Sequence, residues 1–166
     1  VILASTCGAI YDGESQINAV SVPAPKNFYG VTKLAEEQII TGICTLKDVE
    51  CIVTRFTNIF GCFSEHKKSA IHAFIKAGAS NQKAYINGDG KQRRDFIFAA
   101  DVANSLVKLC HFDGRYGSSI QTFAAGNSKS INQICESIRD HIDFETETLD
   151  AVELLTTEPR DIIVDS

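Results

Sequence analysis

Short apolar runs alternate with longer segments of helical period along most of this chain. Three of the runs have the length and composition of buried strands, and they lie at 1–4, 51–56 and 121–124. The longer segments carry apolar residues three or four positions apart, and they lie at 28–46, 71–79, 102–109 and 131–138. Strands that are separated by helices predict βαβ units and a mostly parallel sheet. We therefore expect an α/β fold.

Turn and capping residues mark the ends of several segments. Gly88–Gly90 is typical of a turn, and it separates two short apolar runs at 83–86 and 95–99 that we expect to be strands. Asp101 and Ser130 each stand just before a helical stripe, where a side-chain oxygen can cap the helix. These signals predict helices that begin after Asp101 and after Ser130.

The charge and the cysteine content argue against several functions. The 166 residues have a formal net charge of -5, so there is no excess of positive charge for nucleic-acid phosphates. No apolar run approaches the roughly 18 residues that a membrane span needs. The six cysteines show neither the spacing of a metal site nor that of a small disulfide framework. We therefore expect reduced thiols, a cytoplasmic location, no metal, and neither nucleic acid nor membrane as a partner.

Tyr29 and Lys33 form a candidate proton-transfer pair. They are four residues apart near the start of the predicted helix at 28–46, so their side chains share one face. The pKa of a free tyrosine is about 10, and a neighbouring ammonium group lowers it by favouring the phenolate. Such a pair can exchange a proton with a substrate near neutral pH. The alternative is a surface tyrosine beside a solvated lysine.

Four segments occur in an order that resembles a known enzyme family. They are Ser5–Tyr11 after the first strand, Tyr29–Lys33 at the start of a helix, Arg55–Gly61 at a strand end, and Gly88–Phe96. The chain reads STCGAIY, YGVTK, RFTNIFG and GDGKQRRDF in these segments. The motifs are similar to those in the catalytic half of the extended short-chain dehydrogenase/reductases. Within that family, the chain resembles the NAD-dependent nucleotide-sugar epimerases and dehydratases.

The resemblance implies a Rossmann-type parallel sheet and a bound dinucleotide. NAD is the expected cofactor, with NADP as the alternative. Tyr29 would act as general base and general acid, while the cofactor accepts and returns a hydride. Lys33 would hold the nicotinamide ribose and lower the pKa of the tyrosine.

The same resemblance assigns two residues to the substrate, a nucleotide sugar. Asn58 would contact the sugar or a phosphate, and Arg94 would contact the diphosphate, for which a planar guanidinium is well suited. Asn58 could instead be a turn-forming amide at a strand end. Arg94 could form an ion pair with Asp95 or Asp89, or exchange its role with Arg93.

One position in the loop after the first strand departs from the family pattern. Cys7 stands where most members have the catalytic serine or threonine, and a thiol is a poor hydrogen-bond donor. We assign the catalytic hydroxyl to Thr6, one residue earlier, with Ser5 behind it. The alternative is that Cys7 occupies the position and that activity is altered or lost.

The residues after this hydroxyl distinguish between the reactions of the family. Dehydratases need an acid and a base there, whereas this chain has Gly8 and Ala9, which cannot transfer protons. The resemblance therefore implies 4-epimerisation of a nucleotide hexose through a transient 4-keto sugar. The alternatives are a 4-ketoreductase or a dehydratase of the same family, or a non-catalytic relative that acts as a binding or assembly module.

The domain organisation follows from the family layout. The chain has no glycine-rich dinucleotide-binding turn, starts within a predicted strand and contains no methionine, so we expect a piece of a longer protein. Residues 1–62 are expected to form the second half of the NAD-binding domain, including the helix of Tyr29. Residues 63–166 are expected to be mostly substrate-binding, with about 94–125 returning to the Rossmann sheet. The resemblance also implies a homodimer of the longer protein.

Overall fold

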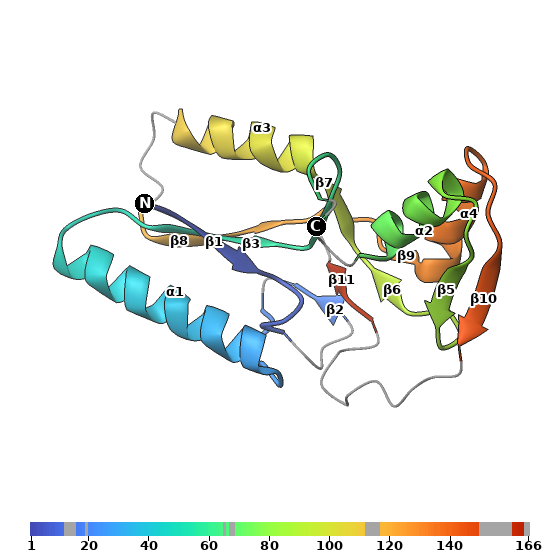
Figure 1. Cartoon of the computed structure of the whole chain (residues 1–166). Coiled ribbons are helices and arrows are strands. Elements are labelled where there is room, and N and C mark those ends of the chain that lie inside the picture. Colours follow the sequence, from blue (N-terminus) through green and yellow to red (C-terminus); the bar gives the residue numbers. More distant parts are fainter. Residues whose placement is uncertain are drawn as a thin grey trace.

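The structure is a computed structural model that describes residues 1–11, 16–18, 20–64, 66, 69–111, 117–149 and 161–164. Its centre is a parallel sheet of three strands in the order β1-β3-β8 (Figure 1). The strands are β1 (Ile2–Thr6), β3 (Ile52–Phe56) and β8 (Ser119–Phe123). Thr6 is aligned with Phe56, and Phe56 with Phe123, so the three strands end at one edge of the sheet. The predicted parallel sheet is confirmed.

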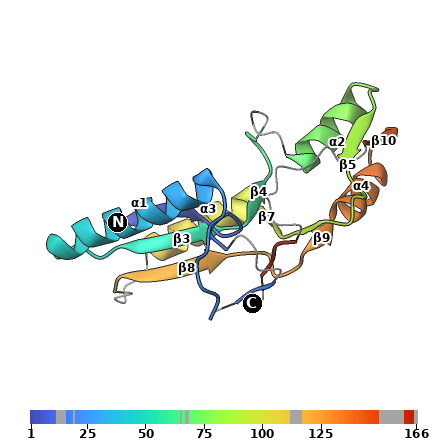
Figure 2. The same ribbon diagram turned by 90° about the horizontal axis from the view of Figure 1, so that it is seen from below.

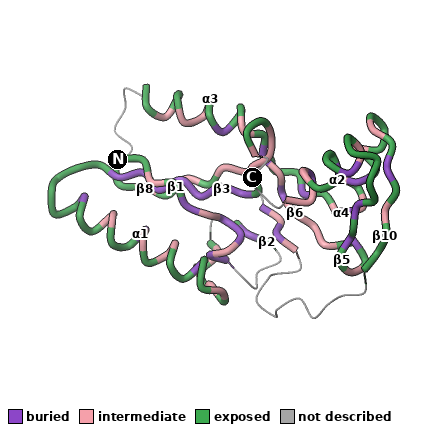
Figure 3. The backbone as a smooth tube through the Cα atoms, viewed as in Figure 1, coloured by how far each residue is buried: buried purple, intermediate pink, exposed green. Residues whose placement is uncertain are grey.

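Two helices cover opposite faces of this sheet. α1 (Phe28–Leu46) connects β1 to β3 on one face, and α3 (Ala99–Cys110) lies on the other (Figures 1 and 2). The middle strand β3 is buried at all its positions, whereas Ile2 in β1 is 37% exposed (Figure 3). The prediction of a buried first strand is therefore only partly correct, because β1 is an edge strand among the residues that the structure describes.

A second group of elements lies at the end of the molecule away from α1 (Figure 1). It consists of α2 (Ala70–Ala79), β5 (Ala84–Asn87), α4 (Ile131–Arg139) and β10 (Thr146–Leu149). β5 and β10 form a parallel pair, α2 packs against α4, and the predicted turn Gly88–Gly90 follows β5. The rings of Phe74 and Phe144 stack in its core with their centroids 5.9 Å apart. This group thus has a hydrophobic core distinct from that of the sheet.

Three short strand pairs lie between the sheet and the second group. The pairs are β4 (Asn58–Phe60) with β7 (Phe96–Phe98), β6 (Arg93–Arg94) with β9 (Lys129–Ser130), and β2 (Gln16–Ile17) with β11 (Ile163–Val164). Of these strands only β7 was predicted, within 95–99. The other five strands are two or three residues long and depend on partners far away in sequence. No local period in the sequence predicts them.

The starts of the helices test the predicted capping residues. Ser130 caps α4 as predicted and forms a capping box with Gln133, whose N–H donates to Ser130 Oγ (3.1 Å). The prediction for Asp101 is wrong, because α3 begins at Ala99, directly after β7, and Phe98 precedes it without a side-chain cap. Asp101 lies in the first turn, where a carboxylate interacts favourably with the helix dipole. No helix in the described part of the chain is long and apolar enough to cross a membrane.

Candidate active site

A cavity of about 400 Å³ opens at the edge where the strands of the sheet end. Its lining comes from segments that are far apart in sequence and includes Thr6, Gly8, Ala9, Asn27, Tyr29, Phe56, Thr57, Asn58 and Arg94. Four predicted site residues are therefore brought together here, namely Thr6, Tyr29, Asn58 and Arg94. Ligands of open α/β sheets bind at the carboxyl ends of the strands. The cavity is therefore the candidate active site.

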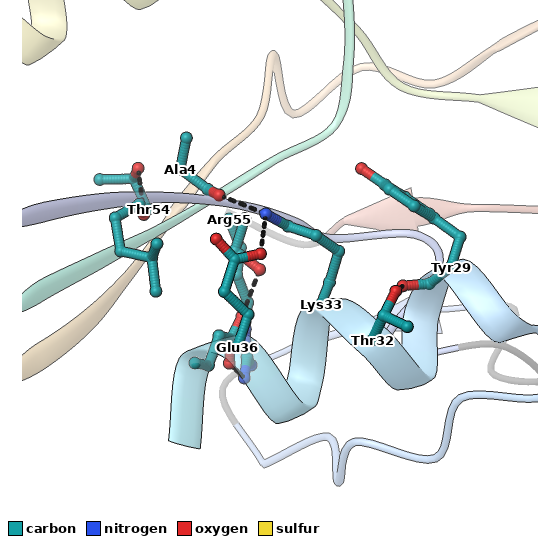
Figure 4. A network of polar contacts seen from close by, with 10 residues as sticks. Ala4, Tyr29, Thr32, Lys33, Glu36, Thr54 and Arg55 are labelled. Carbon is teal, nitrogen blue, oxygen red and sulfur yellow. Dashed lines mark hydrogen bonds and ion pairs between the residues drawn. The ribbon is translucent and has the colours of Figure 1, made fainter. Parts of the chain in front are cut away.

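Tyr29 and Lys33 project from the same side of α1, toward the strands of the sheet (Figure 4). The Lys33 ammonium group donates to the Ala4 carbonyl (2.8 Å) and pairs with the Glu36 carboxylate (2.6 Å). Lys33 is thus held against β1, one helical turn after Tyr29, and it is not among the described residues that line the cavity. The side chains of Tyr29 and Lys33 share a helix face, as their spacing predicts. Glu36 is a partner of Lys33 that the sequence did not indicate.

The start of α1 lies close to the loop after β1 because residue 30 is glycine. A Cβ atom on Gly30 would lie 2.1 Å from the Ala9 carbonyl oxygen, which no other residue type could accommodate without a backbone shift. Asn27 caps the helix, with its side chain accepting a hydrogen bond from the Gly30 N–H (2.8 Å). This close approach brings Tyr29 and Thr6 to the same cavity.

Thr6 is the hydroxyl residue that reaches the cavity. Side chains alternate along a strand, so Ser5 points to the side opposite to that of Thr6, whereas Cys7 follows the end of β1. Ser5 is buried and donates to Glu37 Oε1 (2.5 Å). Cys7 is 0% exposed in a hydrophobic cluster, and burial raises its pKa to about 12 despite the opposing effect of Arg55. Of the three residues considered for the hydroxyl position, Thr6 alone lines the cavity.

The burial of Cys7 predicts selective alkylation. The thiolate is the reactive form of cysteine, so a thiol whose pKa is about 12 stays protonated and inert at pH values near 8. In the native protein, iodoacetamide is expected to modify the exposed Cys62 and Cys110 and to leave Cys7 unmodified, as read by peptide mass spectrometry. Denatured protein is the control, in which all three should react. Native labelling of Cys7 as fast as that of Cys62 would contradict its exclusion from the cavity.

Asn58 and Arg94 reach the cavity from two of the short strand pairs. The backbone and side-chain N–H groups of Asn58 both donate to the Asp95 carbonyl oxygen (3.1 and 3.0 Å). Asn58 thus makes the backbone contact expected of a strand-end amide and also lines the cavity. Arg93 is bound to Ser128 through Nε (3.1 Å to Oγ) and Nη2 (2.6 Å to the carbonyl oxygen). Of the two neighbouring arginines, it is therefore Arg94 that lies at the cavity.

The carboxylate of Asp95 organises this side of the cavity. It is 0% exposed and accepts hydrogen bonds from Thr57 Oγ1 (2.7 Å), Ala125 N–H (2.9 Å) and Asn127 N–H (3.2 Å). Because a buried charge is costly without hydrogen bonds, these donors take the place of water. The sequence suggests Asp95 as an ion-pair partner of Arg94 and does not predict these contacts.

A buried ion pair lies behind the cavity and was not predicted. Glu37 on α1 and Arg55 on β3 are 2% and 3% exposed, with Arg55 Nη2 2.5 Å from Glu37 Oε2 and Nε 3.0 Å from Oε1. The signal that could have found it is spacing, since Glu37 follows Tyr29 by eight residues and Lys33 by four and so shares their face.

Comparison with known proteins identifies relatives of this chain. A protein of Methanocaldococcus jannaschii whose name marks it as an inferred UDP-glucose 4-epimerase is 30% identical over 154 residues. The aligned region covers 90% of this chain and 49% of that protein. The chain therefore spans about half the length of the curated relative that it matches.

Solved structures show the same fold. The UDP-glucuronic acid 4-epimerase of Bacillus cereus, in complex with UDP-glucuronic acid and NAD, has a TM-score of 0.85 at 21% identity, over 99% of this chain and 52% of that chain. The UDP-glucose 4-epimerase of Thermotoga maritima, with UDP-glucose, has a TM-score of 0.86 at 21% identity, over 99% and 53%. The α/β architecture is thus of the Rossmann type found in these proteins. The model of the family described as "NAD dependent epimerase/dehydratase family" matches residues 1–119 of the 166, and the chain therefore belongs to the NAD-dependent epimerase/dehydratase family.

Proposed function

We propose that the protein containing this chain is an NAD-dependent nucleotide-sugar 4-epimerase that acts on a hexose through a transient 4-keto sugar. The observation that carries this proposal is the convergence of Thr6, Tyr29, Asn58 and Arg94 on one cavity. Family membership supports it, as do the names of relatives that are UDP-sugar 4-epimerases.

In this proposal Tyr29 moves the proton. Its phenolate removes the proton of the C4 hydroxyl and later returns it, while the Thr6 hydroxyl shares a hydrogen bond with the same oxygen. The cofactor NAD would supply a hydride acceptor for C4 and then a hydride donor to the opposite face of the sugar. The residues present fit the ribose end of this cofactor, because Tyr29 and Lys33 offer a phenol and an ammonium group on one face of α1.

The lining of the cavity argues for epimerisation over dehydration. Asn58 is proposed to bind the sugar or a phosphate, and the guanidinium of Arg94 to bind the diphosphate. Removal of water from a sugar requires an acid and a base beside the hydroxyl residue. The loop residues Gly8 and Ala9 line the cavity and carry no proton-transfer group, and no carboxylate is among the described residues that line it.

The domain division is part of the proposal. Residues 1–62 would form the second half of the NAD-binding domain, and they include β1, α1 and β3. Residues 63–166 would be mostly substrate-binding, and they include the separate core around Phe74. The segment 94–125 contains α3 and β8, which pack on and within the central sheet and support its return to the NAD-binding domain.

The experiment that tests this function uses the whole protein with NAD. It offers three nucleotide sugars as substrates, namely UDP-glucose, UDP-N-acetylglucosamine and UDP-glucuronic acid. Proton NMR of the reaction mixture separates the C4 epimers of each sugar. An epimerase forms the epimer without net change in NADH. Formation of one NADH per sugar oxidised at C4, without an epimer, would replace the proposal by a ketoreductase acting in the reverse direction, and binding without turnover would replace it by a binding module.

We further propose that the protein is a homodimer that pairs through α1. Exposed apolar residues recur every three to eight positions along α1, on the side that the helical period places opposite Tyr29, Lys33 and Glu37, and they are Phe28, Val31, Ile39, Ile43 and Leu46. Their exposed fractions range from 49% for Val31 to 93% for Phe28. An exposed apolar stripe of this length supports the proposal of a protein interface. The six free cysteines support the proposed cytoplasmic location of this assembly.

The dimer predicts the effect of a charge in the centre of the stripe. Ile39→Glu is expected to convert the protein to a monomer at micromolar concentration, because a carboxylate buried at the contact is left without a partner. Light scattering coupled to size-exclusion chromatography measures the mass. Thr45→Glu adds the same charge on an exposed α1 residue beside the stripe and should leave the dimer intact. A dimer that survives Ile39→Glu would place the contact elsewhere.

A further inference from the structure

The face of α1 that carries Tyr29 and Lys33 continues into a buried polar network. Tyr29, Lys33 and Glu37 follow one another at intervals of four residues. Glu37 lies about 12 Å further along the helix axis than Tyr29, from the rise per residue of an α-helix. Tyr29 opens on the cavity, whereas Glu37 is 2% exposed. One end of this face thus lines the cavity and the other is enclosed by protein.

Glu37 is bound by residues from two strands of the sheet. Arg55 of β3 contacts both carboxylate oxygens, and Ser5 of β1 donates to Oε1 (2.5 Å). Such a two-point contact fixes rotation as well as distance, because the guanidinium and the carboxylate must stay nearly coplanar. Arg55 also donates to the Tyr11 hydroxyl, and its guanidinium lies 5.2 Å from the centre of the Tyr11 ring. The network therefore joins α1, β1, β3 and the loop after β1.

Each strand residue of the network stands next to a residue of the cavity. Ser5 precedes Thr6, and Arg55 precedes Phe56, and both following residues line the cavity. Side chains alternate along a strand, so the network and the cavity occupy opposite sides of the same strand ends. The Glu37 contact thus ties α1 to the two strands whose last residues line the cavity opposite Tyr29.

Arg55 and Tyr11 keep their ordinary protonation states, but the buried ion pair adds little to the stability of the fold. Burial alone would lower the pKa of Arg55, but the Glu37 carboxylate outweighs it and the pKa is raised, so Arg55 stays charged. Burial raises the pKa of Tyr11, so its hydroxyl stays protonated. A buried ion pair is often no more stabilising than apolar residues of similar volume, because both ions lose their hydration. What the pair adds over an apolar contact is directional geometry.

We propose that Glu37 and Arg55 are positioning residues, which set the rotation and axial position of α1 so that Tyr29 and Thr6 meet at the cavity. A slip of α1 by one residue would change its position by about 1.5 Å and its rotation by about 100°. Apolar contacts such as those of Leu34 and Ile40 tolerate small slides, whereas the two-point contact does not. The proposal rests on the proposed function for what Tyr29 does, but not for where Tyr29 lies.

The test replaces both charged residues together in the whole protein. Glu37→Leu combined with Arg55→Met keeps similar volumes and removes the two-point contact, so the midpoint of thermal unfolding should stay within about 5 °C. Amide hydrogen exchange in residues 28–34 should become about tenfold faster, because the start of α1 is no longer held. The kcat should fall by about tenfold or more, with KM for the nucleotide sugar changed by less than about threefold.

Two further variants make the test specific. Lys83→Met with Glu145→Leu removes a surface ion pair of the second group, whose atoms are 3.6 Å apart, and should change none of these quantities. Arg55→Lys keeps the charge but cannot contact both oxygens of Glu37. We expect Arg55→Lys to reproduce the loss of kcat at unchanged KM. If the double variant does not fold, Arg55→Lys alone tests whether the two-point contact positions α1.

Each outcome bears on the proposal. Unchanged hydrogen exchange in 28–34 together with kcat within about twofold of the wild type would overturn it. A fall in kcat that only parallels a fall in stability would also overturn it, since the pair would then be merely structural. If the wild-type protein has no turnover with any of the three nucleotide sugars, the proposed function fails, while hydrogen exchange still reports whether the pair positions α1.

Discussion

The variant Tyr29→Phe is expected to lower kcat for epimerisation by about a thousandfold, within the range that a positioned proton-transfer group contributes. The change removes only the phenolic oxygen of a residue that is 59% exposed, so the fold and the stability should be unaffected. KM for the nucleotide sugar should change by less than about threefold, because Asn58 and Arg94 are intact. Initial rates of epimer formation at saturating substrate measure the effect.

A matched control exists within the chain. Tyr85 on β5 is 55% exposed and belongs to the second group, away from the cavity. Tyr85→Phe makes the same chemical change at a similar exposure and should leave kcat unaltered. Equal turnover of the wild type and Tyr29→Phe would end the assignment of Tyr29 as the proton-transfer residue.

The variant Asp95→Ala is expected to destabilise the protein by about 3 kcal/mol, because it removes a fully buried carboxylate and leaves three donors without this acceptor. These donors are Thr57 Oγ1 and the backbone N–H groups of Ala125 and Asn127. Since Thr57 lines the cavity next to Asn58, binding of the nucleotide sugar should weaken as well. Denaturant unfolding followed by circular dichroism measures the change in the free energy of unfolding.

Two further variants serve as comparisons for Asp95→Ala. Asp95→Asn retains one oxygen acceptor in the same shape and should cost clearly less than Asp95→Ala. Asp143→Ala removes an exposed carboxylate and should stay within about 0.5 kcal/mol of the wild type. An Asp95→Ala protein as stable as Asp143→Ala would show that water replaces the carboxylate, and that Asp95 does not organise the cavity.

Elements with a strong local period could be predicted from the sequence. The helix predicted at 28–46 has these bounds in the structure, and the runs at 51–56 and 121–124 differ from β3 and β8 by only a few residues. Short elements could not be predicted, because the two residues of β6 become a strand only through their pairing with β9. The error at Asp101 has the same origin, since β7 leads directly into α3 and takes the place of a capping residue.

Sequence by itself determined that Tyr29 and Lys33 share one helix face, because these positions follow from the 3.6-residue period alone. Only the tertiary structure decided which hydroxyl reaches the cavity, which arginine lies there, and that Glu37 and Arg55 are buried together. These outcomes depend on where a strand side chain points and on what packs against it. Both are set by contacts between segments far apart in the chain, which no local pattern encodes.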